Sequence, residues 1–491
     1  MNQALRRVSL ACLVLFLLLL VNANYVQAFE AGKLSNDPGN GRTFAQQYQY
    51  QRGSIITSDN KTIAVSNHVS GIYSYQRVYP DPLPYAPVTG YDTPYSVTGI
   101  ERAENKLLAG TDPRLTVHNL IDLITGKPKK GATVQLTVNS VAQEAAYSAL
   151  KSTGLPAGAV AIDPRTGAIL ALASYPTFNP NKLATFDGNA LRRADEKYLN
   201  SPQQPLLNRA INETFPPGST FKIVTSSTAF STGKFTPQTP YNAPTNLKLP
   251  DTTNQLINYD NLPCGSGGKV PLIYAFTVSC NTVFGGLGMQ LGSRALRHQA
   301  DKFGMNRSLR IPLTVSPSNF PSVSAPAFTA YSAIGQYNDT VTPLQEAMFS
   351  ATIANGGTLM RPYMVQRVIA PNLSALVTTQ PTPLSQVVSP RVADQVTQMM
   401  TSVVSNPIGT AHQSAYIPGL PIAAKTGTAQ NGTNNTGLDD AVFTCFAPVG
   451  NPVIAVGVVV KGGGLGADAS APVAVKIIKA YTRYLASQAK R

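Results

Sequence analysis

The strand-like segments of this chain fall into two groups that are far apart in the sequence. GAVAIDPRTGAILALASY, beginning at Gly158, contains two apolar runs joined by the turn DPRTG, which predicts a β-hairpin. PIAAKTGTAQ, AVFTCFAP and PVIAVGVVVKGG, all after residue 420, predict three further strands. Helical patterns dominate between about residues 219 and 360. The two groups must therefore pair around a helical insertion, which predicts an α+β fold with an antiparallel sheet of about five strands.

Helical segments flank both strand groups. SVAQEAAYSAL precedes the hairpin, and PVAVKIIKAYTRYLASQAK, which is basic and amphipathic, ends the chain. With 491 residues, 43% of them hydrophobic, the chain is long enough to bury a large core and to form more than one domain.

The N-terminus carries an apolar segment that reaches the ~20 residues needed to span a bilayer. Arg6 and Arg7 precede it, and no charge follows until Glu30. The arginines predict a cytoplasmic tail over residues 1–7, a transmembrane anchor over 8–28 and an extracytoplasmic body. A signal peptide cleaved near Val26-Gln27-Ala28 is the alternative. Both readings place the body outside the cytoplasm.

Composition divides the body into two parts. Residues 29–130 are rich in Tyr, Pro, Asn and Gly, and RGSIITSDNKTIAVS predicts a hairpin within them. The stretch from Tyr79 to Tyr95 carries five prolines and is expected to be irregular or extended. We predict a small, β-rich and loop-rich N-terminal module, followed from residue 131 to 491 by the sheet-containing domain.

Charge and metal-ligand patterns narrow the function classes. The net charge of +15 suits an anionic partner, but no Lys/Arg stripe interleaved with aromatics and no nucleic-acid motif is present, which argues against nucleic-acid binding. The four histidines are dispersed, and the spacing of the four cysteines fits no zinc pattern, so we expect no metal site. Cys12 lies in the anchor and Cys445 in an apolar strand, where a buried free thiol is expected.

Ser219 and Lys222 stand three residues apart in FPPGSTFK. Pro216, Pro217 and Gly218 resist helix formation, so a helix should begin at or just before Ser219. The serine would then lie at the positive end of the helix, with Lys222 on the same face of its first turn. A neutral lysine there can take the proton of the serine, which predicts a nucleophile and its base. A serine N-cap with a solvated lysine is the simpler alternative.

Two further polar motifs favour the catalytic reading of Ser219 and Lys222 over the simple helix cap. Ser279-Cys280-Asn281 interrupts an otherwise apolar segment, and Lys425-Thr426-Gly427-Thr428 lies on a predicted strand. Glycine inside a strand often marks the close approach of a ligand or of another backbone. Taken alone, the first motif could simply cap a helix, and the second could lie on an exposed edge strand.

The order S-x-x-K, S-x-N, K-T-G resembles the motif set of the penicillin-binding proteins and serine β-lactamases. RGSI (52–55), GIERAENKLLAG (99–110) and AIGQYNDTVTPLQEAMFSATIANGG (333–357) are similar to segments of the class B penicillin-binding proteins, and most similar to the actinobacterial penicillin-binding protein A type. The resemblance covers nearly all of the chain after the anchor. It implies the fold of the penicillin-binding transpeptidase domain, with no cofactor.

The resemblance implies a D,D-transpeptidase that cross-links peptidoglycan stem peptides during growth or division and is acylated by β-lactams. Ser219 would attack the carbonyl between two D-alanines, and Lys222 would take its proton. Ser279 would relay the proton to the leaving amine, Asn281 would hold the substrate amide, and Lys425 would keep positive charge in the site. Thr426, Gly427 and Thr428 would bind the substrate, with the backbone N–H groups of Ser219 and Thr428 as the oxyanion hole.

Other readings share these motifs: a D,D-carboxypeptidase, a serine β-lactamase, and a non-catalytic β-lactam sensor or division scaffold. A β-lactamase needs a deacylating base, for which Glu346 is the acidic candidate, although its context predicts a helix residue. Beyond stem peptides, β-lactams and the membrane, expected partners are cell-division or elongation proteins.

Cys264 and Cys280 are expected outside the membrane, where disulfides form. LPCGSGGKVPLIYAFTVSC joins them through a glycine-rich turn that can fold back. We predict a disulfide between them, which would tether the backbone of Ser279 and Asn281 and turn the Cys280 side chain away from the site. Two buried free thiols are the alternative.

Overall fold

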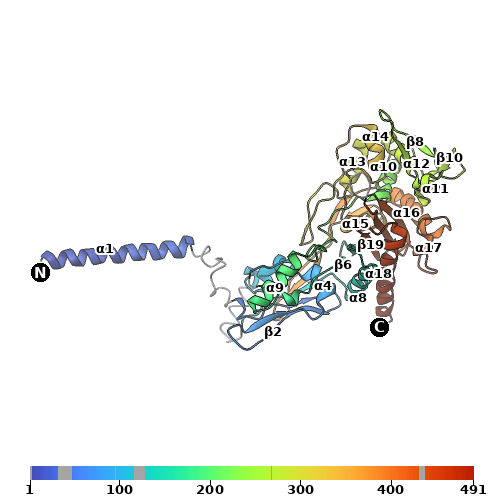
Figure 1. Ribbon diagram of the computed structural model, residues 1–491. Helices are drawn as coiled ribbons and strands as arrows, with labels where there is room; N and C mark the ends of the chain where they lie inside the picture. The colour runs from blue at the N-terminus through green and yellow to red at the C-terminus, as the bar shows by residue number, and fades with distance from the viewer. Residues whose placement is uncertain are drawn as a thin grey trace.

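The computed structural model describes residues 3–30, 47–93, 95–115, 128–266, 268–430 and 437–490. The predicted anchor is a helix, α1 (Gln3–Tyr25), followed by a π-helical turn, Val26–Glu30. The segment Leu5–Glu30 is long and apolar enough to cross a membrane, and none of its most apolar window is buried against the body of the protein. Figure 1 shows α1 extending away from that body.

The predicted five-stranded antiparallel sheet is confirmed. Its order is β17-β18-β19-β5-β6, so the two groups of strands meet where β19 pairs with β5. The strands are β5 (Ala157–Ile162), β6 (Ile169–Tyr175), β17 (Ala423–Ala429), β18 (Asp440–Ala447) and β19 (Ile454–Val460). Nearly all of their residues are buried, as expected for a sheet covered by helices.

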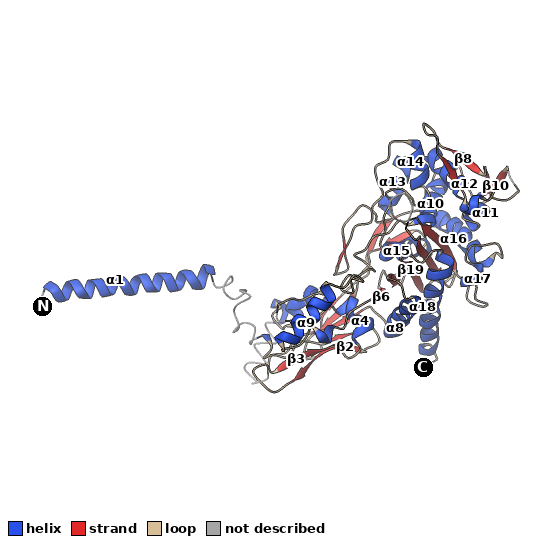
Figure 2. Cartoon of the chain, viewed as in Figure 1, coloured by secondary structure: helices blue, strands red, loops and turns tan. Residues whose placement is uncertain are grey.

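Helices from both ends and from the middle of the chain cover this sheet (Figure 2). α8 (Ser140–Thr153) and α18 (Gly466–Gln488) pack on each other and on the strands. α15 (Pro343–Ala354), which is buried along almost its whole length, packs against β19, β5 and β18. α15 approaches the sheet so closely that a Cβ added to Gly457 would lie 2.3 Å from the backbone nitrogen of Ala347.

The helical middle of the chain forms a lobe beside the sheet. It contains η4 (Gly218–Phe221), α10 (Lys222–Ser231), α11 (Leu272–Thr277), α12 (Asn281–Leu291), α13 (Ser293–Lys302), α14 (Pro326–Ser332) and, further along the chain, α16 (Pro390–Ser405) and α17 (His412–Ala415). Short antiparallel pairs decorate it: β7 (Pro240–Asn242) with β10 (Lys269–Pro271), β8 (Asn246–Lys248) with β9 (Gln255–Ile257), β11 (Leu309–Arg310) with β12 (Thr314–Val315), and β13 (Thr358–Met360) with β16 (Pro383–Gln386).

The N-terminal part is built on a second sheet of order β15-β14-β4-β1-β2-β3. The predicted hairpin is confirmed as β1 (Ile55–Ile56) and β2 (Thr62–His68), followed by β3 (Tyr75–Val78) and β4 (Thr133–Leu136). The remaining strands, β14 (Val365–Ile369) and β15 (Ala375–Thr378), come from the C-terminal half. The two parts of the body therefore share a hydrogen-bonded sheet.

The expectation of an irregular segment between Tyr79 and Tyr95 is wrong for its first half. Residues Pro82–Thr89 form helix α4, with proline at its start and Pro87 inside it. Prolines in a first turn cost no hydrogen bond, because the N–H groups there have no partner within the helix. Further helices in the N-terminal half are α5 (Gly99–Ala103), α6 (Asn105–Leu108) and α9 (Gly188–Leu199).

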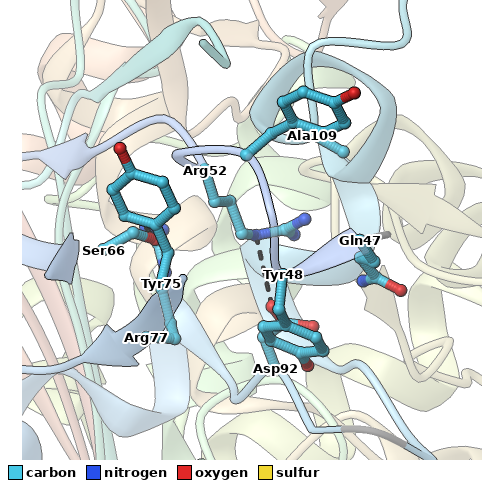
Figure 3. Close-up of a pocket in the computed structure, with 9 residues that line it drawn as sticks. Gln47, Tyr48, Arg52, Ser66, Tyr75, Arg77, Asp92 and Ala109 are labelled. Atoms are coloured by element: carbon cyan, nitrogen blue, oxygen red, sulfur yellow. Dashed lines mark hydrogen bonds and ion pairs between the residues drawn. The ribbon is translucent and has the colours of Figure 1, made fainter. Parts of the chain in front are cut away.

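A buried charge cluster holds the N-terminal sheet to α5. Glu101, which is fully buried, receives hydrogen bonds of 2.6 Å from both Arg52 and Arg77. Arg52 also forms an ion pair with Asp92, with Nε and Oδ2 3.6 Å apart. Figure 3 marks this pair with a dashed line in the small pocket beside Tyr48. The two guanidinium groups hold the pKa of Glu101 below its usual value against the opposing effect of burial.

Candidate active site

The predicted helix start at Ser219 is confirmed. Gly218–Phe221 forms a 3₁₀ turn that runs directly into α10 at Lys222. Gly218 has a φ of +55°, and a Cβ added to it would lie 2.7 Å from the backbone oxygen of Thr428. A glycine is therefore required here, both for the backbone conformation and for the close approach of β17.

Lys222 is fully buried, and its amino group meets the other two motifs. Its Nζ lies 2.9 Å from Ser219 Oγ, 2.8 Å from Asn281 Oδ1, and 2.7 Å and 3.2 Å from the backbone oxygen and Oγ of Ser279. A neutral lysine can donate to the Ser279 carbonyl and to Asn281 and keep its lone pair for the proton of Ser219.

Lys425 approaches from β17 on the other side of Ser279. Its Nζ lies 2.9 Å from Ser279 Oγ and 3.0 Å from the backbone oxygen of Thr426. It also stands 5.5 Å from the centre of the Phe276 ring, a distance that favours a cation. Ser279 Oγ thus lies between two lysine amino groups.

Burial and charge set the protonation of this pair. Burial lowers the pKa of Lys222 well below its usual value, and the charge of Lys425 lowers it further. Burial also lowers the pKa of Lys425, to about 7. Both effects shift Lys222 toward its neutral form, which is the form that a general base requires.

Ser279 occupies the turn between α11 and α12 with a φ of +59°, a conformation that costs a non-glycine residue free energy. The side chain of Asn258 supports this turn: its Oδ1 accepts hydrogen bonds from the backbone N–H groups of Asn281 and Thr282. Asn258 thereby caps α12. Sequence reasoning missed it, because Asn258 lies on a distant irregular segment.

The expected disulfide is confirmed: Cys264 and Cys280 are bonded, with their Cα atoms 6.0 Å apart. The Cys280 side chain is buried beside Asn258 and Thr282, whereas Ser279 and Asn281 contact Lys222. Cys445 is a buried free cysteine, as expected.

The K-T-G segment forms the strand side of the site. A Cβ added to Gly427 would lie 2.7 Å from the backbone oxygen of Pro217, so the expected close approach of another backbone is present. Thr426 Oγ1 lies 2.7 Å from Thr410 Oγ1, and Gln336 donates a hydrogen bond to the backbone oxygen of Thr428.

Gln336 and Thr410 were not predicted as site residues. Gln336 belongs to the family-like segment beginning at Ala333, so its neighbourhood carried a signal, whereas Thr410 lies outside every motif. The polar, glycine-containing segment NGTNNTGLDD (431–440) predicts a mobile loop beside the site, but residues 431–436 of it lie outside the described residues.

Comparisons with known proteins agree with this geometry. The family described as "Penicillin binding protein transpeptidase domain" matches residues 157–479, and "Penicillin binding protein A dimerisation domain" matches residues 52–134. The chain is 43% identical to the peptidoglycan D,D-transpeptidase PbpA of Mycolicibacterium smegmatis, over 94% of each chain. It is 40% identical to PbpA of Mycobacterium tuberculosis, over 98% of this chain and 99% of the relative.

Solved structures show the same likeness. Penicillin-binding protein A of M. tuberculosis in its ceftriaxone acyl-enzyme complex superposes with a TM-score of 0.86 at 38% identity, covering 89% of this chain and 99% of that one. Its imipenem acyl-enzyme complex gives a TM-score of 0.85 at 39% identity, covering 89% of this chain and 100% of that one. The chain belongs to the penicillin-binding protein transpeptidase family.

Proposed function

We propose that this protein is a peptidoglycan D,D-transpeptidase that acts through an acyl-enzyme on Ser219. The observation that carries the proposal is the 2.9 Å contact between Ser219 Oγ and the buried amino group of Lys222, whose pKa burial and Lys425 lower. The relatives of 40% and 43% identity bear the name of this activity, and the M. tuberculosis structures contain β-lactam acyl-enzymes.

In the acylation step, Ser219 Oγ attacks the carbonyl carbon of the D-Ala–D-Ala bond while its proton passes to Lys222. The C–N bond then breaks, and the leaving amine takes a proton through Ser279, which lies between both lysines. The terminal D-alanine departs, and the donor stem remains as an ester on Ser219. Backbone N–H groups of Ser219 and Thr428 stabilise the oxyanion, a contribution of about 3–4 kcal/mol for each donor.

In the second step, the amine of an acceptor stem attacks the ester carbon and gives up a proton to Lys222. The C–O bond to Ser219 then breaks, the proton passes through Lys222 and Ser279 to Ser219 Oγ, and the cross-linked peptide leaves with its new amide bond. Asn281 plays a different part, and we assign it to the binding of the substrate amide. Thr426 and Thr428, on the edge strand beside the charge of Lys425, suit the terminal carboxylate of the donor stem.

Glu346 does not fit the deacylating base of a β-lactamase. It lies on α15, as its context predicted, and is fully buried. Among the described residues its side chain forms a hydrogen bond with the hydroxyl group of Thr220, whereas the contact of Ser219 Oγ is with Lys222. This placement favours a long-lived β-lactam adduct over rapid hydrolysis.

Membrane attachment accords with the proposed reaction. We propose that α1 anchors the chain in the cell membrane as a single span, with Arg6 and Arg7 on the cytoplasmic side and the catalytic domain outside, where peptidoglycan lies. Proteins of cell division or elongation are the proposed partners. The proposed domain boundary remains at residue 130, with residues 29–130 as the non-catalytic module.

The reaction is tested with the detergent-solubilised full chain, a donor stem pentapeptide and an acceptor stem. A transpeptidase releases D-alanine and forms a cross-linked dimer in comparable amounts. Release of D-alanine with tetrapeptide and no dimer at high acceptor concentration would instead identify a carboxypeptidase. Absence of both products, with no β-lactam adduct, would identify a scaffold.

A further inference from the structure

A series of hydrogen bonds links Glu346 to the turn that carries the nucleophile Ser219. The hydroxyl oxygen of Thr220 lies 2.8 Å from Glu346 Oε1 and 2.8 Å from the backbone oxygen of Pro217. Thr220 and Glu346 are both fully buried. Thr220 directly follows Ser219, and Pro217 precedes it by two residues, so this chain holds the turn from both sides.

The number of protons available to these contacts bears on whether Glu346 is protonated. A threonine hydroxyl has one proton and can donate only one hydrogen bond. If it donates to the Pro217 carbonyl, then the contact with Oε1 is a hydrogen bond only when the carboxyl group itself carries a proton and donates it. A protonated Glu346 satisfies both contacts of the Thr220 hydroxyl, whereas a carboxylate would compete with the Pro217 carbonyl for the single Thr220 proton.

The surroundings of the carboxyl group agree with a neutral acid. Glu346 Oε2 has no hydrogen-bond partner among the described residues, and no described cation forms an ion pair with it. A buried, unpaired carboxylate is costly. Burial raises the pKa of Glu346 to about 8, and the contact with the Thr220 side chain offsets that rise only in part.

The position of the Pro217 carbonyl explains why this matters for catalysis. This carbonyl packs against Gly427 of β17, where a Cβ would lie 2.7 Å from its oxygen. The same turn and the same strand provide the N–H groups of Ser219 and Thr428 that we assign to the oxyanion hole. A change in the hydrogen bond to Pro217 therefore changes the alignment of both donors.

We propose that Glu346 is a positioning residue, which in its protonated form fixes the Ser219 turn against β17 through Thr220 and Pro217. This inference rests on the proposed role of Ser219 as the nucleophile. Loss of the proton removes the donor to Thr220, frees the turn and slows acylation.

The titratable groups on the elements around α15 are few in the described structure. They are Lys222 on α10, Lys425 on β17, Asp440 and Cys445 on β18, and Arg391 and Asp394 on α16. Arg391 and Asp394 are exposed, and Cys445 lies on the opposite face of β18 from Thr444, which donates to the backbone oxygen of Glu346. Lys222 and Lys425 titrate in the site itself, so the test compares variants that retain both.

The test measures the second-order rate constant of penicillin acylation of the full chain from pH 6 to 9.5. Glu346→Gln mimics the protonated acid, since its amide both donates and accepts. The ratio of its rate constant to that of the wild type is expected near one at pH 6.5 and about tenfold at pH 9, where about one tenth of a group with a pKa near 8 is protonated. Glu104→Gln is the matched control, because burial also raises the pKa of this carboxyl group, in the N-terminal part, and its ratio should be flat.

Thr220→Val removes the hydroxyl group that links Glu346 to Pro217 and keeps the side-chain volume. It should slow acylation several-fold at pH 6.5, and adding Glu346→Gln to it should produce no further pH-dependent gain. A flat ratio for Glu346→Gln alone, or an undiminished gain in the Thr220→Val background, would overturn the inference. Circular dichroism at each pH separates these effects from unfolding. An adduct on Ser219 with a flat ratio rejects only the role of Glu346, whereas an adduct mapped elsewhere rejects the proposed nucleophile as well.

Discussion

At the residue scale, the site depends on two neighbouring lysines that are expected to differ in charge. Lys425→Met removes the cation and keeps the volume of the side chain. The loss of that charge should raise the pKa of Lys222, because like charge is one of the two causes that lower it. Less neutral base then remains at pH 7, and acylation should slow by about tenfold for each unit by which the pKa rises.

The pH profile of penicillin acylation checks this prediction. Its rising limb should move to higher pH in Lys425→Met, so that the deficit shrinks as the pH increases toward 9. Lys269→Met, at an exposed position, is the control and should reproduce the wild-type profile. A Lys425→Met profile parallel to that of the wild type would contradict the assignment of Lys222 as the base.

At the scale of elements, β17 and the Ser219 turn touch at a position that only glycine allows. Gly427→Ala places a methyl group 2.7 Å from the backbone oxygen of Pro217, and backbone atoms cannot rotate away as a side chain can. We expect acylation to slow at least about tenfold, by analogy with the loss of an oxyanion donor. Gly188→Ala is the control, because its added Cβ meets no atom within 4 Å. Equal acylation rates of the two variants would refute the tight contact.

The disulfide acts on a second element, the turn between α11 and α12. Reduction should lower the free energy of unfolding by about 3 kcal/mol in the chain-entropy model, and it should slow acylation by loosening Ser279 and Asn281. Thiol titration of the unfolded, unreduced protein should find two thiols, Cys12 and Cys445, of the four cysteines. Four titrated thiols would contradict the bond.

At the scale of the whole molecule, the N-terminal sheet includes β14 and β15 from the C-terminal half. Removing one of its buried charges should therefore lower the free energy of unfolding of the whole body, not only that of the N-terminal module. Arg77→Met removes one of the two arginines that pair with the fully buried Glu101 and should cost roughly 3–5 kcal/mol in unfolding free energy. Arg165→Met removes an exposed arginine that pairs with the half-buried Asp163 and should cost less than about 1 kcal/mol. Chemical denaturation measures both values, and equal costs would disprove the role of the cluster.

Much of this architecture is encoded locally and was predictable. The hairpin of β5 and β6, the three C-terminal strands and the helix start at Ser219 follow from apolar periodicity and from proline and glycine. α4 was not predictable in this way, because its prolines disfavour helix locally and its burial supplies the compensation. Asn258, Thr410 and the partnership of Glu346 with Thr220 depend on contacts between segments far apart in the sequence, for which a single sequence carries no periodic signal.

The central claim is that Ser219 is the nucleophile, and one measurement tests it most directly. The full chain and its Ser219→Ala variant are incubated with penicillin, and the intact masses and proteolytic peptides are measured. Loss of the hydroxyl should cost at most about 1–2 kcal/mol at a helix start, so the variant should remain folded. We predict that the wild type gains one penicillin mass on the peptide containing Ser219 and that the variant gains none. A folded Ser219→Ala protein that still takes up penicillin would contradict the account.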